Sequence, residues 1–162
     1  MKRSYTFYNQ KSGAEIYGTQ VRKKEELVGR IALKLFPLEK GKEKIILMLL
    51  PEEAFRLALS LEHAVSDKKG IATLIVHKRE KDETELTTTL HIDYWEKDRK
   101  QGWGITLVQK KKGAEKGYKL SVSLSKPNAL FLSELLRKWS VEQAFKIYDP
   151  ADPAMEESEI PF

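Results

Sequence analysis

The side chains best suited to chemistry are few, and their spacing fits no familiar reaction centre. The three histidines, His63, His77 and His91, lie at none of the i, i+3 or i+4 spacings that hold a metal ion on one helix face, and the chain has no cysteine. No glutamate has a lysine two residues later, as a common metal-dependent nuclease core requires, and no Gly-x-x-x-x-Gly-Lys-Ser/Thr loop is present to hold phosphates. His91-x-Asp93 alone would place two kinds of metal ligand on one strand face. We therefore expect no enzyme, no cofactor and no metal site.

Aromatic residues interleaved with basic ones indicate a different chemistry. Near the N-terminus Tyr5, Phe7 and Tyr17 precede Arg22 and Lys23. Aromatic rings stack on nucleobases while Lys and Arg hold phosphates, so this composition is typical of a surface that binds single-stranded nucleic acid. The same residue types also form strands and cores, so we expect half of these aromatic side chains to face inward.

The charge is distributed unevenly along the chain. All 29 Lys and Arg residues precede Asp149, together with 19 of the 24 acidic residues, so residues 1–148 carry a net +10. Residues 149–162 carry five acids, no base and half of the six prolines. A basic body of this kind indicates a polyanionic partner, with a merely well-solvated surface as the alternative. The acidic tail has too few apolar groups to fold alone, and we expect it to be disordered.

No segment indicates a membrane or export. The longest apolar run, Ile45 to Leu50, is far shorter than the ~20 residues that cross a bilayer. Met1-Lys2-Arg3 leads into polar sequence rather than into the apolar core of a signal peptide. We expect a cytoplasmic protein without a membrane partner, either associated with the nucleoid or a phage protein in a bacterial cytoplasm.

The order of expected elements repeats once. Each half shows four strand patterns followed by a helix that begins at a proline, Pro51 or Pro127, where the missing amide of proline costs nothing. A shift of 76 residues superimposes the two prolines and also Phe55 on Phe131. The expected strands cover residues 4–8, 14–23, 29–36, 44–49, 71–78, 84–95, 103–110 and 118–125, with turns that include 11–13 and 100–102. We expect one basic domain, 1–148, built from the repeats 1–69 and 70–148.

Strand alternation in the second half predicts which sheet face is buried. Leu86, Leu90, Ile92, Tyr94, Ile105, Leu107, Tyr118, Leu120, Val122 and Leu124 fall on one set of faces and form the expected core. The opposite faces carry Thr87, Thr89, His91, Asp93, Trp95, Thr106, Lys110, Lys119, Ser121 and Ser123. This second surface is polar and partly basic and holds an aromatic ring, which favours binding of single strands over an ordinary solvated sheet. The residues expected to contact nucleic acid are Tyr5, Phe7, Tyr17, Arg22, Lys23, Lys34, His91, Trp95, Trp103, Lys110, Lys111, Lys112 and Lys119.

The twofold β-β-β-β-α order, the basic sheet and the proline-led helices resemble the Whirly and transcriptional positive-coactivator fold. The resemblance covers residues 4–146 and rests on architecture, without a diagnostic motif. It implies an α+β protein in which two antiparallel sheets pack with two main helices and bind single-stranded DNA or RNA. It also implies an internal pseudo-dimer and, with it, a homo-oligomer. A five-stranded oligonucleotide-binding (OB) barrel is the alternative fold, although it leaves the second half of the chain unexplained.

The end of the chain resembles the acidic tip of bacterial single-stranded DNA-binding proteins. The matching residues are Glu156, Glu157, Glu159, Ile160, Pro161 and Phe162. In that family the tip docks on replication and repair enzymes, the terminal Phe and its carboxylate entering a basic-rimmed apolar pocket. Here the acids are Glu rather than an Asp run, and the linker is short, which puts the range of partners in question.

The expected function is therefore sequence-tolerant binding of single-stranded DNA, which protects the strand, together with recruitment of bacterial replication, recombination and repair proteins through the tip. A transcription regulator or RNA-binding module of the same fold is the alternative.

Overall fold

The structure is a computed structural model that describes residues 3–146 and 154–156. Each half of the chain supplies four strands and then one helix, and a short strand follows. The elements of the first half are β1 (Ser4–Tyr8), β2 (Ser12–Lys23), β3 (Glu26–Pro37), β4 (Ile45–Leu49) and α1 (Pro51–Asp67). Those of the second half are β5 (Ile71–Lys81), β6 (Thr84–Lys97), β7 (Lys100–Lys111), β8 (Tyr118–Leu124) and α2 (Lys126–Phe145), after which comes β9 (Met155–Glu156).

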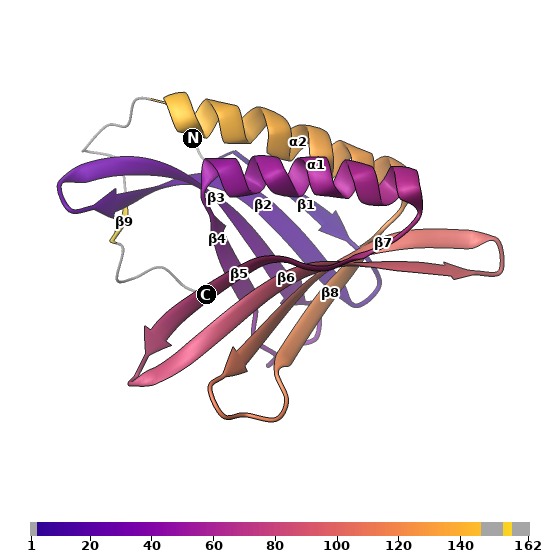
Figure 1. Cartoon of the computed structure of the whole chain (residues 1–162), viewed down its shortest axis with the longest axis horizontal. Helices are drawn as coiled ribbons and strands as arrows, with labels where there is room; N and C mark the ends of the chain where they lie inside the picture. The colour runs from indigo at the N-terminus through magenta and orange to yellow at the C-terminus, as the bar shows by residue number, and fades with distance from the viewer. Residues whose placement is uncertain (1–2, 147–153, 157–162) are drawn as a thin grey trace.

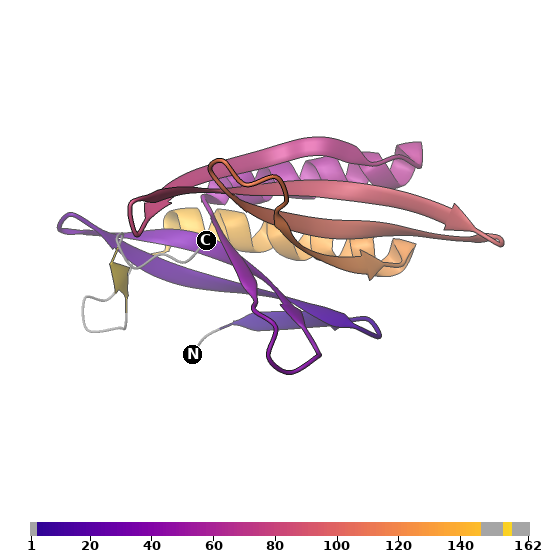
Figure 2. The ribbon, with the colours of Figure 1, turned by 90° about the horizontal axis from the view of Figure 1, so that it is seen from below.

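Each repeat forms its own antiparallel sheet. Neighbouring strands pair in chain order, β1-β2-β3-β4 in the first sheet and β5-β6-β7-β8 in the second, and β9 joins the first sheet beside β2. Figure 2 shows the two sheets as separate layers. Among the residues that the structure describes no closed barrel forms, which rules out the OB-fold alternative. The predicted α+β fold of two ββββα repeats is confirmed.

Two hairpins of the second sheet are closed by two-residue turns rather than by glycines. Asp82 and Glu83 join β5 to β6, and Asp98 and Arg99 join β6 to β7, all four with φ between 50° and 64°. Turns with positive φ at both central residues match the twist of the flanking strands. The turn predicted at residues 100–102 is therefore wrong, as is the turn predicted at 11–13 for its last two residues, since Ser12–Gly13 begins β2. In both places the glycine lies within a strand.

Both sheets and both helices share one hydrophobic core. The inner faces contribute Ile16, Ile31, Leu33, Leu90, Ile92, Ile105, Leu107 and Val122, among others, as strand alternation predicted for the second half. Trp103 of β7 is fully buried, and its indole Nε1 donates a hydrogen bond of 3.0 Å to the carbonyl oxygen of Ala64 in α1. One tryptophan thus joins the two repeats. Tyr118, expected in this core, is instead 38% exposed because it begins β8 at the end of the sheet.

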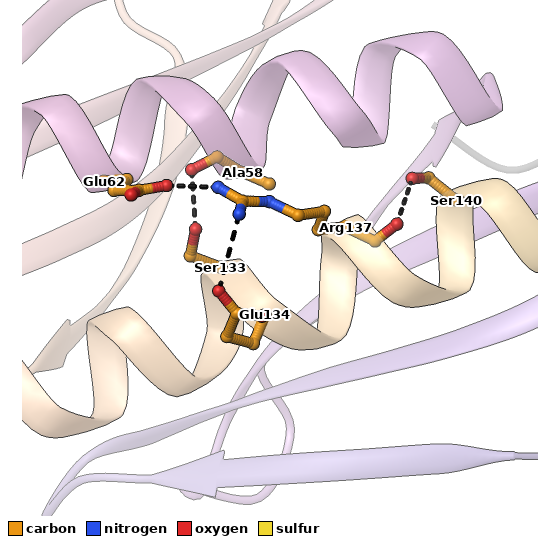
Figure 3. A network of polar contacts seen from close by, with 6 residues as sticks. All are labelled: Ala58, Glu62, Ser133, Glu134, Arg137 and Ser140. Atoms are coloured by element: carbon orange, nitrogen blue, oxygen red, sulfur yellow. Dashed lines mark hydrogen bonds and ion pairs between the residues drawn. The ribbon is translucent and has the colours of Figure 1, made fainter.

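The two helices lie side by side and run in opposite directions (Figure 1). Ser133 Oγ donates a hydrogen bond of 2.7 Å to the carbonyl oxygen of Ala58, and the side chain of Arg137 extends back along α2 to contact Glu62 (Figure 3). Both pairs are 75 residues apart in sequence. This offset nearly equals the 76-residue shift between the repeats, so these contacts join nearly equivalent positions of the two helices.

The buried face of α1 is formed mainly by small and aliphatic side chains. It consists of Ala54, Leu57, Ala58, Leu61, Ala64 and Val65. Phe55 and Leu59 lie outside this face and are 36% and 39% exposed. The buried face of α1 packs against α2 as well as against the sheets.

Glu53 fastens the start of α1 to the second sheet. Its carboxylate accepts a hydrogen bond of 2.9 Å from the backbone N–H of Leu50, the residue before the helix, and lies 2.8 Å from Nε2 of His77 on β5. Burial on its own would raise the pKa of Glu53, but the hydrogen bonds from His77 and Leu50 outweigh it and hold the pKa below its ordinary value. The ionised form of Glu53 therefore stabilises the fold.

We expect Glu53→Ala to lower the free energy of unfolding by about 1 to 2 kcal/mol near neutral pH, since it removes a helix cap and a charged hydrogen bond. A carboxyl whose folded-state pKa is lowered contributes stability above its unfolded pKa and loses it as pH falls through the folded pKa. Urea titrations at about pH 7 and about pH 3 should show the difference between wild type and variant shrinking at the lower pH. Exposed Glu52→Ala is the matched control, and an equal loss in the two variants would contradict the role of Glu53.

Candidate functional site

On the outward face of the second sheet, the aromatic ring of Trp95 packs against Gly102 on the neighbouring strand. Trp95 on β6 is directly paired with Gly102 on β7. A Cβ atom on Gly102 would lie 2.6 to 2.7 Å from three atoms of the indole, so the ring rests directly on the backbone at that point. The indole Nε1 donates a hydrogen bond of 2.6 Å to Ser123 Oγ on β8. With 41% of its surface exposed, Trp95 is held in place and still accessible.

A polar row lies next to this ring on the same face. The buried hydroxyl of Thr106 donates a hydrogen bond of 2.7 Å to the carboxylate of Asp93 and shares another of 2.8 Å with the hydroxyl of Ser121. His91 Nε2 lies 3.4 Å from the same carboxylate. These bonds cross β6, β7 and β8, so the face around Trp95 is fixed by hydrogen bonds before any ligand arrives.

The first sheet repeats the arrangement with Phe36. A Cβ atom on Gly13 would lie 2.3 Å from Cζ of Phe36, which is paired with it across β2 and β3. Tyr8, 66% exposed, contacts the same ring edge-on at 6.1 Å between centroids, and Lys34 Nζ lies 5.6 Å from the ring centroid. An aromatic ring with a cation beside it is again seated on the outward face.

The start of β2 lies against β8 at the edge of the second sheet. Ser12, next to Gly13, donates a hydrogen bond of 2.8 Å from its hydroxyl to the carbonyl oxygen of Ser121 on β8. This contact places the start of β2 against β8, the strand that carries Ser121 and Ser123.

Most of the predicted site residues lie on or beside these two faces. His91, Trp95, Lys110 and Lys119 share the outward face of the second sheet, while Lys111 and Lys112 are exposed where β7 ends. Tyr17 and Lys34 lie on the outward face of the first sheet, and Arg22 and Lys23 end β2. Tyr17 is half-buried over Ala32, and burial, with the nearby charge of Glu15, raises the pKa of its phenol.

Three predicted site residues lie elsewhere. Trp103 and Phe7 are buried in the core, with 0% and 5% of their surfaces exposed, so neither can stack on a base, and these two predictions are wrong. Tyr5 faces α2 rather than the outward surface, because its ring packs edge-on against Phe131 at 5.0 Å. Each of the three follows the alternation that points its strand toward the core.

The sequence interpretation missed the partners that hold the exposed rings in place. The sequence predicts turns at Gly13 and Gly102, a strand at Phe36 and a polar face at Ser123, and it indicates no contact among them. An aromatic residue in one strand and a glycine in the next strand could have indicated these contacts. The strand register must be known, however, before the two residues can be paired.

The part of the acidic tail that the structure describes is paired rather than disordered. Residues of β9 lie parallel to β2, with Met155 opposite Val21 and Glu156 opposite Arg22. Among the predicted tip residues, Glu157, Glu159, Ile160, Pro161 and Phe162 lie outside the described residues.

No three His, Asp or Glu side chains among the described residues lie close enough together to hold a metal ion. Within the same residues no helix is both long and apolar enough to cross a membrane.

Comparisons with known proteins reveal similarity at the level of structure. No protein-family model matches the chain, and no curated protein matches it either. Among solved structures, WHY1 from Arabidopsis thaliana matches with a TM-score of 0.63 at 10% identity, over 90% of this chain and 86% of that one. WHY3 from the same plant matches with a TM-score of 0.63 at 13% identity, over 88% of each chain.

The plant transcriptional regulator PBF-2 matches with a TM-score of 0.63 at 13% identity, over 89% of this chain and 82% of that one. At such low identity the likeness is one of fold, and it extends over both repeats. The chain has the Whirly fold that its repeated strand and helix order predicts.

Proposed function

We propose that this protein binds single-stranded DNA, without strong sequence preference, on the outward faces of its two sheets. The observation that carries the proposal is Trp95, held against the backbone at Gly102 and hydrogen-bonded to Ser123, on a face that presents Lys110 and Lys119 further along. An exposed ring held in place on a sheet stacks on bases of any kind, while lysines further along the same face neutralise phosphates.

The surface suits a single strand better than a duplex. An extended sheet face with rings seated on it offers no helix or narrow ribbon to enter a groove, whereas the bases of a single strand are free to stack. The +10 body supplies the electrostatic part of the affinity by releasing the counterions of the strand.

The first test is fluorescence anisotropy with labelled oligo-dT of about 30 nucleotides, beside a duplex of equal length. We expect tight binding to the single strand and much weaker binding to the duplex. If about five phosphates are contacted, affinity should fall roughly 100-fold between about 50 and 200 mM salt. Equal affinity for the single strand and the duplex would contradict the proposal and would indicate that the basic body attracts nucleic acid by charge alone.

Substitution at Trp95 tests the proposed stacking directly. Trp95→Ala should weaken oligo-dT binding by about 1 to 3 kcal/mol, which is roughly 5- to 150-fold, whereas Trp95→Phe, which keeps a ring but not the bond to Ser123, should lose less. Gly102→Ala should act like Trp95→Ala because its methyl group displaces the indole. Phe145→Ala removes an even more exposed aromatic from α2 and serves as the control. An unchanged affinity for Trp95→Ala and Gly102→Ala would exclude stacking at this face.

RNA binding or transcription regulation by the same fold is the second candidate function. The description of PBF-2 as a plant transcriptional regulator favours it. An oligo-U arm in the same anisotropy experiment separates the candidates, since a preference for ribose over deoxyribose strands would favour the RNA-binding module.

We also propose that the tail recruits genome-maintenance proteins through Ile160, Pro161 and Phe162, and that its acids compete with DNA for the basic body. The proposal is supported by the five acids of residues 149–162 and by the pairing of β9 with β2, which brings the backbone of Glu156 opposite Arg22.

Removal of residues 149–162 should tighten oligo-dT binding at low salt, because the net charge rises from +5 to +10, and the gain should fade as salt screens it. Anisotropy at the two salt concentrations measures the effect. Phe162→Ala is the matched variant: it should keep the DNA affinity of the full chain and lose bacterial partner proteins in a pull-down. An unchanged affinity after truncation would contradict the competition.

Self-association stays a prediction. Large apolar side chains exposed on the helices support it, and they are Phe55, Leu59, Phe131, Val141 and Phe145.

A further inference from the structure

A cleft of about 720 Å³ opens between the β3–β4 loop and the far ends of β5, β6 and β7. Its lining includes Phe36, Lys42, Lys44, Arg79, Lys81 and Gln109. The cleft is separate from the Trp95 face, which lies at the opposite end of the β6–β7 hairpin. Its volume is within the range of small-molecule sites, roughly 300 to 1,000 Å³.

Unequal strand lengths create this cleft. The last strand of the first sheet, β4, has 5 residues, whereas β5, β6 and β7 have 11, 14 and 12. At the end of β5, the start of β6 and the end of β7, side chains on the core side of the second sheet have no strand of the first sheet opposite them. Leu86, predicted as a core residue, is only partly buried for this reason and lines the cleft instead. The hydroxyl of Tyr118 on β8 donates a hydrogen bond of 2.6 Å to the carbonyl oxygen of Glu43, which ties the β3–β4 loop to the second sheet.

The lining combines an apolar wall with cations and an unused donor. Phe36, Ile46 and Leu86 supply apolar surface, and four basic side chains face a single carboxylate, that of Glu43. The side-chain nitrogen of Gln109 is buried and donates to no acceptor in the described part of the chain. A buried donor without a partner is unfavourable, so a ligand that supplies an acceptor there is bound more tightly.

We propose that this cleft takes one nucleotide of the bound single strand, with a base against the apolar wall and an adjacent phosphate among the lysines. The inference rests on the proposed function and deepens it. The unused N–H of Gln109 favours a ligand that carries a hydrogen-bond acceptor, as every nucleobase does, and an all-apolar ligand would leave it unpaired. Phe36 connects the two surfaces, since the ring seated on Gly13 also lines the cleft.

The first experiment observes the side-chain amide of Gln109 by ¹⁵N NMR while the chain is titrated with thymidine monophosphate or with inorganic phosphate. The nucleotide should shift the Gln109 resonance, and phosphate alone should leave it nearly unchanged. Equal shifts from both ligands would overturn the proposal and leave an adventitious anion only.

The second experiment compares two double variants by oligo-dT anisotropy. Lys44→Ala with Lys81→Ala removes two cations of the cleft, and Lys97→Ala with Lys100→Ala removes two exposed lysines at the other end of the second sheet. We expect the cleft variant to lose at least fivefold more affinity for oligo-dT than the control variant. Gln109→Leu should also lose affinity, although it changes no charge.

These arms distinguish the two proposals. If the cleft variants bind oligo-dT like the wild type while Trp95→Ala does not, the nucleotide site is refuted and the proposed function stands. If the wild-type chain does not bind oligo-dT at all, the proposed function fails and the cleft proposal fails with it.

Discussion

The single core shared by both repeats is the constraint on which the rest of the structure depends. Each sheet has one apolar face, and neither sheet can leave that face in water. The faces are covered by each other and by the two antiparallel helices, and buried Trp103 is hydrogen-bonded to Ala64 of the other repeat. Because the inner faces satisfy the hydrophobic requirement, the outer faces are free to carry polar, basic and aromatic residues. The proposed binding surface exists because the core occupies the opposite side of the same strands.

Glycine within the strands has a specific role in this protein. Gly13 and Gly102 each lie beneath an aromatic ring from the neighbouring strand, and a side chain at either position would displace that ring. Glycine weakens a strand because it packs nothing, and the covering ring offsets that cost. The aromatic ring that covers the glycine is already held in one orientation before a ligand binds. Stacking a base on it therefore costs less side-chain conformational entropy. The same pair serves stability and the proposed recognition.

Divergence between the two repeats is concentrated in strand length. Contacts between the helices still join nearly equivalent positions, as those of Ala58 with Ser133 and of Glu62 with Arg137 show. The strands of the second sheet extend beyond β4, and their uncovered inner ends form the basic cleft beside Phe36 and Gln109. A duplicated fold thereby gains a surface that neither repeat would have alone.

Local sequence determined the strands and helices and which side of each strand is buried, and the tertiary structure decided which side chains share a site. Alternation and the proline-led helices predicted the two ββββα repeats, the buried faces around Leu90, Ile105 and Val122, and the exposure of Trp95, because these depend on periods of a few residues. Charge asymmetry and the tail motif are likewise local. The position of Trp95 against Gly102 and the cleft at Gln109 depend on strand register and on how far one sheet extends past the other. Such distances are set by packing between residues far apart in the chain, which no local pattern encodes.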